Sequence, residues 1–230
     1  MGPTRTPERL REEGDVTNAL WTLVVPLKPL ALAKSRLAAA VGEARPALAL
    51  AFALDTVAGA LACPAVRNVV VVTDDPAAGA ALAELGAEIV PDLPAAGLNA
   101  ALAHGARAAR LDRAGSAVAA MNADLPALRP GELQRVLDTA RAFPRAFLAD
   151  AAGIGTTLLS AAPGVELAPA FGGRSRARHS ASGAVEIDLP GVPSVRRDVD
   201  TGADLLAAAE LGLGAHTAAC RAAPATAQRR

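Results

Sequence analysis

Short apolar runs alternate with longer stretches of mixed polarity along the first part of this chain. Runs rich in Val, Leu and Ala are typical of strands buried on both faces of a sheet, and the longer stretches between them are typical of helices. The expected strands are Trp21–Leu27, Asn68–Thr73, Ala87–Val90 and Ser116–Met121, and the expected helices are Ala44–Ala62, Asp74–Leu85, Leu98–Leu111 and Pro130–Arg141. This alternation predicts an α/β fold, a mostly parallel sheet with helices on both faces.

The pattern changes beyond Arg145, where no regular alternation continues. The elements expected there are strands at Ala146–Ala149, Thr156–Ser160 and Val195–Val199, a basic, glycine-rich loop or short helix at Phe171–Ser180, and a helix start at Thr201. Thr201 followed by Asp204 has the spacing of a capping box. We expect a single domain whose second half is elaborated.

The chain has 230 residues, 52% of them hydrophobic, which is enough to bury a core. A membrane-spanning helix is not expected, because the longest apolar candidate, Ala44–Cys63, contains Arg45, Pro46 and Asp55. Residues 1–18 lack the apolar segment of a signal peptide, so the expected location is the cytoplasm. The predicted organisation is a disordered leader over 1–18, a single domain over 19–215 and a flexible tail over 216–230.

Charge and aromatic content argue against a nucleic-acid partner. The 23 Lys and Arg residues equal the 23 Asp and Glu residues, so the net charge provides no attraction to a polyanion. Aromatic residues make up 2% of the chain, which disfavours a surface that stacks bases. Cys63 and Cys220 lack the spacing of a metal site and are expected to be thiols without a catalytic role.

Asp124 stands shortly after the strand expected at Ser116–Met121, so it should lie at the carboxyl edge of the sheet, where open α/β sheets bind ligands. A carboxylate there suits Mg²⁺. Asp198 and Asp200 are two residues apart and would share one face of a strand. The alternative is structural: Asp200 would stabilise the following helix start, and Asp198 would form a surface ion pair.

A basic loop follows the first strand and carries Lys28, Lys34 and Arg36. A phosphate-binding P-loop is excluded, because that motif requires Gly at positions 28 and 33, which are Lys28 and Ala33. The three cations could bind a triphosphate through side-chain charge. The alternative is a solvated basic loop.

Two glycine-containing segments, Gly153–Thr157 and Phe171–Ser180, could form an anion site from backbone N–H groups and the hydroxyls of Thr156 and Ser175. Arg174, Arg176, Arg178 and His179 would surround it with positive charge, which suits a small phosphorylated acceptor. The alternative is a flexible hairpin loop. Asn99 is either a helix cap or a ligand of a nucleotide base or ribose.

These segments together resemble one family, the guanylyltransferases that act on phosphoenolpyruvate or 2-phospho-L-lactate in coenzyme F-420 biosynthesis. The matching pieces are Val25-Pro26-Leu27-Lys28, Ala33-Lys34-Ser35-Arg36-Leu37, Leu98-Asn99-Ala100-Ala101, Asp124-Leu125-Pro126-Ala127-Leu128, Gly153-Ile154-Gly155-Thr156, Phe171-Gly172, Ser175, Ala177-Arg178-His179, Ser182-Gly183-Ala184-Val185-Glu186, Asp198-Val199-Asp200-Thr201 and Ala203-Asp204-Leu205. They occur in the family's order over nearly the whole chain.

The resemblance implies a Rossmann-like, three-layer nucleotidyltransferase fold related to GT-A transferases. It assigns Asp124, Asp198 and Asp200 to Mg²⁺, Thr156, Gly172 and Ser175 to a phosphorylated three-carbon acid, and Lys28, Lys34, Arg36 and Asn99 to GTP, with Asp124, Lys28 and Lys34 as catalytic residues. It also implies transfer of the product to a downstream deazaflavin transferase.

The implied reaction is attack of the acceptor's phosphate oxygen on the α-phosphorus of GTP. The bacterial character of the composition, rich in Ala and in Arg over Lys, favours phosphoenolpyruvate as acceptor. The alternatives are 2-phospho-L-lactate, 3-phosphoglycerate, a nucleotidyltransferase of another pathway and a non-catalytic nucleotide-binding module. Enzymes of other pathways usually carry a glycine-rich loop after the first strand, and the loop after Pro26 contains no glycine up to Lys34.

Overall fold

The computed structural model describes residues 20–31, 34, 37, 41–93, 95–111 and 115–223. Arg36, the expected leader over 1–18 and the last seven residues, 224–230, lie outside the described residues.

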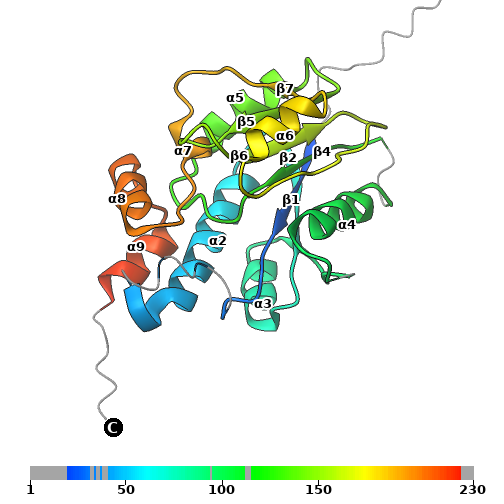
Figure 1. The fold of residues 1–230 in the computed structure, drawn as a ribbon. Helices are drawn as coiled ribbons and strands as arrows, with labels where there is room; N and C mark the ends of the chain where they lie inside the picture. Colours follow the sequence, from blue (N-terminus) through cyan, green and yellow to red (C-terminus); the bar gives the residue numbers. More distant parts are fainter. Residues whose placement is uncertain are drawn as a thin grey trace, which may run out of the picture.

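The described chain forms a seven-stranded sheet with the order β3-β2-β1-β4-β6-β5-β7 (Figure 1). The strands are β1 (Trp21–Pro26), β2 (Val66–Val72), β3 (Glu88–Val90), β4 (Ala117–Met121), β5 (Arg145–Ala149), β6 (Thr156–Ala161) and β7 (Val185–Glu186). Neighbouring strands are parallel except that β6 is antiparallel to both β4 and β5. The prediction of a mostly parallel sheet is confirmed, and β7 was not predicted.

Helices cover both faces of the sheet and complete three layers. They are the 3-10 helix η3 (Gly42–Ala44), α2 (Arg45–Leu61), α3 (Pro76–Glu84), α4 (Leu98–Leu111), α5 (Pro130–Ala140), α6 (Ser175–Ala181), α7 (Pro193–Arg196), α8 (Gly202–Leu211) and α9 (Ala215–Ala222). Buried side chains of α2, α3 and α5 share one hydrophobic cluster with the sheet, and those of α4 share another on the opposite face. The predicted three-layer α/β architecture is confirmed.

The central strands bury side chains on both faces, as their continuous apolar composition predicts. In β1, Leu23 and Val25 belong to the cluster under α2, whereas Val24 belongs to the cluster under α4. Helix α4 packs closely on the second face at Gly105, where a Cβ would stand 2.6 Å from methyl groups of both Val24 and Val72. Glycine is therefore required there by space.

Helix α2 is apolar on two sides because it is covered on two sides. Ala53 and Val57 face the sheet, whereas Leu48 and Phe52 join a third cluster with α8. Among the described residues, Gly42–Leu61 is the one helical stretch long and apolar enough to match a membrane span, and half of that stretch is buried inside the protein. The hydropathy of α2 is accounted for by this burial.

The strand predicted at Val195–Val199 is wrong. Pro193 begins the short helix α7, a position that proline favours because its φ is already helical and it has no N–H to satisfy. Val195 then packs into the cluster under the sheet, and Val199 packs into the cluster around α2 and α8. The two valines thus pack into different hydrophobic clusters. On a strand, residues four apart point to the same face and would pack into the same one.

The flexible tail predicted from residue 216 is wrong for its first part, because Ala215–Ala222 forms α9, which packs against α2 (Figure 1). The buried Asp55 of α2 accepts hydrogen bonds from the N–H groups of His216 at 3.0 Å and Thr217 at 2.8 Å. A carboxylate at this position satisfies N–H groups that the first turn of a helix leaves without partners. Asp55 therefore caps α9 from another helix.

Replacing Asp55 with Ala should release α9. We expect hydrogen exchange of residues 215–222 to rise strongly and the free energy of unfolding to fall by about 1–3 kcal/mol, because two buried N–H groups lose a charged acceptor. Gly214→Ala should act in the same direction, since its Cβ would stand 2.3 Å from the Asp55 carboxyl carbon.

The matched control is Asp138→Ala on α5, where the carboxylate is 51% exposed and pairs with Arg141 at 3.3 Å. Exchange mass spectrometry and urea denaturation measure both effects. Unchanged protection of α9 in Asp55→Ala would show that apolar packing alone holds this helix.

Candidate active site

A cleft of about 820 Å³ opens at the sheet edge where the parallel strands end. The predicted site residues that line it are Lys28, Lys34, Asp124, Thr156, Gly172, Ser175, Asp198 and Asp200. The cleft lies where β1 meets β4, the point at which the order of the parallel strands reverses and open α/β sheets bind ligands. Because β6 is antiparallel, its first residue, Thr156, reaches the same edge.

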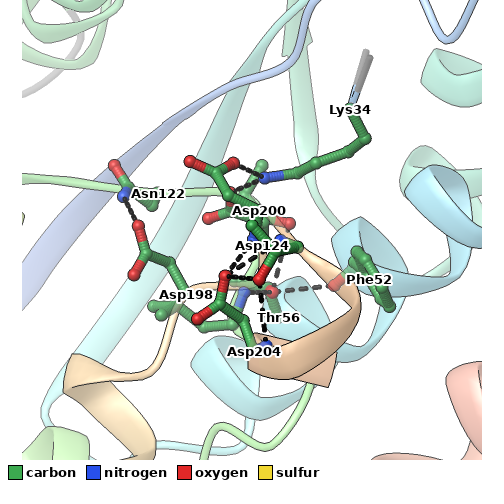
Figure 2. Close-up of polar contacts among 11 residues, drawn as sticks. Lys34, Phe52, Thr56, Asn122, Asp124, Asp198, Asp200 and Asp204 are labelled. Carbon is green, nitrogen blue, oxygen red and sulfur yellow. Dashed lines mark hydrogen bonds and ion pairs between the residues drawn. The ribbon is translucent and has the colours of Figure 1, made fainter. Parts of the chain in front are cut away.

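Asp124 is held by contacts to its backbone neighbours. The Thr56 hydroxyl of α2 accepts a hydrogen bond from Leu125 N–H at 2.9 Å and donates to the Phe52 carbonyl at 2.7 Å (Figure 2). The Asp124 carbonyl accepts from Val199 N–H at 3.0 Å. Since Val199 stands between Asp198 and Asp200, this last bond brings all three carboxylates together without a strand at 195–199.

Lys34 lies against two of these carboxylates. Its ammonium donates to Asp124 and, at 2.8 Å, to Asp200 (Figure 2). Burial by itself would lower the pKa of Lys34, but the charges of Asp124 and Asp200 outweigh it and raise that pKa above the usual value. The backbone of Lys34 has φ 55°, in the left-handed region that a lysine rarely adopts. The chain therefore accepts local strain where it delivers this cation.

The pKa of Asp198 is raised by burial and by the neighbouring carboxylates. Burial, followed by the charges of Asp124, Asp200 and Asp150, raises the pKa of Asp198 to about 7. Asn122 donates to it at 3.4 Å.

Two further residues of the cleft, Asn122 and Asp150, were not predicted. Each follows directly on a strand, β4 and β5 respectively, so the rule that identified Asp124 could have found both. Asp150 also accepts hydrogen bonds from the N–H groups of Ile154 at 2.9 Å and Gly155 at 2.7 Å, which shapes the glycine turn before Thr156.

The donor chemistry of these carboxylates fits a hard divalent cation. One oxygen of Asp124, Oδ1, is buried and has no hydrogen-bond partner among the described residues, and the repulsion acting on Asp198 would be relieved by positive charge. As the side chains stand, no three potential ligands in the described part of the chain are grouped for metal binding, and the Lys34 ammonium provides the positive charge between Asp124 and Asp200.

Thr156, Ser175 and the loop that contains Gly172 also line the cleft. Thr156 and Ser175 are buried, and Gly172 has φ 93°, which favours glycine. The Thr156 hydroxyl lies 2.9 Å from Nδ1 of the buried His179. Ser175 begins α6, so one of the two expectations for Phe171–Ser180, a short helix, is confirmed.

Two of the four basic residues predicted to surround the anion site are engaged in structural contacts. Arg176 pairs with Glu186 at 3.0 Å, and Arg178 donates to the carbonyls of Ala170, Phe171 and Gly172. Burial, with the charges of Arg145 and Arg178, lowers the pKa of His179 to about 4, so His179 is neutral at pH 7. Arg174 lines the cleft.

Asn99 neither caps α4 nor lines the cleft. Its amide accepts from Phe171 N–H at 2.7 Å and donates to the Phe171 carbonyl at 3.2 Å. Asn99 therefore holds the backbone of the loop before Gly172, and contact with a nucleotide stays a prediction. Arg36 lies outside the described residues.

Thr56→Val should loosen the segment that carries Asp124. Valine keeps the shape of threonine but leaves Leu125 N–H without an acceptor, so we expect a loss of about 1–3 kcal/mol in unfolding free energy and faster exchange of that amide. Thr56→Ser, which keeps the hydroxyl, is the control. Equal behaviour of the two variants by urea denaturation and amide exchange would contradict this role.

Comparison with known proteins identifies the family of this chain. The MobA-like NTP transferase domain family matches residues 28–185. The phosphoenolpyruvate guanylyltransferase of Streptomyces avermitilis is 70% identical over 203 residues, which cover 88% of this chain and 94% of that protein. The protein of the same name from Thermomonospora curvata is 59% identical over 202 residues, covering 88% and 89%.

Solved structures support the fold. A protein from Desulfovibrio desulfuricans G20, described as a nucleotide-diphospho-sugar transferase, superposes with a TM-score of 0.61 at 18% identity, covering 80% of this chain and 84% of that one. Rv0371c from Mycobacterium tuberculosis H37Rv superposes with a TM-score of 0.52 at 23% identity, covering 84% and 99%, and is also known as a complex with manganese. The chain therefore belongs to the phosphoenolpyruvate guanylyltransferase family among the MobA-like NTP transferases, and it is a nucleotidyltransferase.

Proposed function

We propose that this chain transfers GMP from GTP to phosphoenolpyruvate, with enolpyruvyl-diphospho-5′-guanosine and pyrophosphate as products. The similarity to phosphoenolpyruvate guanylyltransferases over most of both chains supports this reaction. The observation that carries it is a single cleft whose lining combines three carboxylates and two lysines with buried hydroxyls and a glycine loop. One side suits a nucleoside triphosphate with its cation, and the other suits a small phosphorylated acid.

The proposed step is an in-line displacement. A lone pair of the acceptor's phosphate oxygen forms a bond to the α-phosphorus of GTP, and the bond from that phosphorus to the α,β-bridging oxygen breaks, so that its electron pair leaves with pyrophosphate. The attacking oxygen is already an anion, so no residue has to remove a proton. Catalysis then consists of positioning and charge neutralisation.

The residues divide this work by charge. Lys28 and Lys34 lie at the end of β1 and would neutralise phosphate oxygens of GTP. Asp124, Asp198 and Asp200 would hold Mg²⁺. When bound, Mg²⁺ supplies positive charge to the phosphate oxygens of the nucleotide. Each proposed role follows from the side chain's place in the cleft and from the family resemblance.

Thr156, Gly172 and Ser175 would bind the acceptor. The two hydroxyls are buried at the cleft wall, where a hydrogen bond to an anion is stronger than in water. They offer directed donors in a confined space, which suits a three-carbon acid better than an extended substrate.

We place the product in coenzyme F-420 biosynthesis, in the cytoplasm, with transfer to the downstream deazaflavin transferase. The family resemblance supports this assignment. 2-Phospho-L-lactate is the alternative acceptor, since it carries the same phosphate and carboxylate groups on three carbons.

Pyrophosphate release by the purified protein tests the proposal. With GTP and Mg²⁺ we expect release that depends on phosphoenolpyruvate, in an assay that includes the downstream transferase and its deazaflavin acceptor because the product is labile. 2-Phospho-L-lactate and 3-phosphoglycerate are compared in parallel. Asp124→Asn should lower kcat by about 100-fold or more, because it removes negative charge from the centre of the cation site.

Asp138→Asn is the matched control, because Asp138 is an exposed residue of α5 away from the cleft. Its activity should equal that of the unmodified chain. Release with 2-phospho-L-lactate alone would reassign the acceptor. No release with any of the three acids, from folded protein that binds GTP, would contradict catalysis and favour a nucleotide-binding module.

A further inference from the structure

The His179 imidazole connects two parts of the cleft wall. Its Nδ1 lies 2.9 Å from the Thr156 hydroxyl, and its Nε2 accepts a hydrogen bond from Ala170 N–H at 2.9 Å. His179 is fully buried, and its ring contacts those of Phe147 and Phe171 at centroid distances of 5.7 and 5.1 Å. The ring is therefore fixed in place between β6 and the loop that leads to Gly172.

These two contacts determine where the imidazole proton lies. A backbone N–H can only donate, so Nε2 must present its lone pair to Ala170. A neutral imidazole then carries its proton on Nδ1 and donates it to Thr156. His179 is held neutral by burial and by the guanidinium groups of Arg145 and Arg178, the charged groups that act on it from β5 and α6.

The tautomer determines what Thr156 can do. Because its oxygen accepts from Nδ1–H, the proton of the Thr156 hydroxyl is available for another acceptor. With the opposite tautomer, that proton would be donated to Nδ1, and Thr156 would present only lone pairs to the cleft. Lone pairs repel an anion, whereas an O–H donor binds it.

The same ring also determines the position of the glycine loop. The Asn99 side chain forms hydrogen bonds with the N–H and the carbonyl of Phe171. The Arg178 guanidinium donates to the carbonyls of three loop residues, Ala170, Phe171 and Gly172. His179 accepts from the N–H of Ala170, the first of these three residues. These contacts engage the loop from the side of α4 and α6, and Gly172 lines the cleft.

We propose that His179 is a positioning residue for the anionic acceptor: as the Nδ1–H tautomer it makes Thr156 a hydrogen-bond donor into the cleft while it fixes the loop that carries Gly172. The assignment of this wall to the acceptor rests on the proposed function. His179 itself does not touch the substrate, and it acts through Thr156 and Ala170.

The tautomer is measured directly, without activity, by long-range ¹H–¹⁵N NMR of the full chain at pH 7. The chain has three histidines, and His179→Gln identifies the signals that belong to His179. We expect a protonated Nδ1 and an unprotonated Nε2. A protonated Nε2, or an imidazolium, would overturn the proposal whatever reaction the protein catalyses.

A double-mutant cycle tests the connection to Thr156. Phosphoenolpyruvate is titrated into the full chain, and its Kd is compared for the unmodified protein, Thr156→Val, His179→Gln and the double variant. Gln can accept from Ala170 N–H in place of Nε2 but does not reproduce the donor at Nδ1. We expect each single change to weaken binding by about 10- to 100-fold, and His179→Gln to add little in the Thr156→Val background.

Binding of GTP provides the matched readout, because the proposed function assigns Thr156 to the acceptor and not to GTP. Its Kd should stay within about twofold in all variants, and His179→Asn, which keeps a donor near Nδ1, should retain most of the affinity for phosphoenolpyruvate. Additive losses, or equal losses for GTP and phosphoenolpyruvate, would identify His179 as purely structural. Absence of phosphoenolpyruvate binding in the unmodified chain would also overturn the proposal. Binding without turnover would contradict only the proposed reaction.

Discussion

The constraint on which this site depends is the repulsion between carboxylates gathered at one strand end. Asp124, Asp198 and Asp200 come from two distant segments. Burial, followed by the charges of Asp124, Asp200 and Asp150, raises the pKa of Asp198 to about 7. The Lys34 ammonium offsets part of this repulsion, at a backbone conformation that costs a lysine on the order of 1 kcal/mol. A site that carries such excess negative charge is prepared for cations and for the phosphates that accompany them.

Hydrogen bonds to the backbone around Asp124 hold the carboxylates in place against this repulsion, and one of them comes from helix α2. Thr56 binds the backbone beside Asp124, and the Asp124 carbonyl binds Val199. The residue before Thr56, Asp55, caps α9, which packs against the same helix. Apolar packing on two sides makes α2 rigid enough to position a polar group. The core of the fold and the geometry of the carboxylates are thus stabilised by one element.

The sequence predicted what depends on local patterns and missed what depends on distant partners. The valines of β2 and the apolar run of β4 indicate buried parallel strands, and a parallel strand places Asp124 at the ligand-binding edge. The strand predicted at Val195–Val199 was wrong, and no local pattern shows that Val195 and Val199 pack into two different cores. The cap on α9 and the contact of Asn99 with Phe171 join residues far apart in the chain, and no local pattern encodes them.

The cleft combines charged side chains with uncharged hydroxyl donors, and the proposed reaction gives each kind a separate role. In the proposed reaction, the nucleotide side of the cleft would use full charges, since pyrophosphate leaves with additional negative charge that lysines would stabilise more in the transition state than before it. On the side proposed for the acceptor, Arg174 lines the cleft, whereas Arg176 and Arg178 are engaged in structural contacts and His179 is neutral. Strong positive charge around the attacking oxygen would stabilise it before the reaction and reduce its nucleophilicity. Directed hydroxyl donors such as Thr156 can orient the acceptor while leaving that oxygen reactive, which makes the orientation of a single O–H bond a determinant of the site.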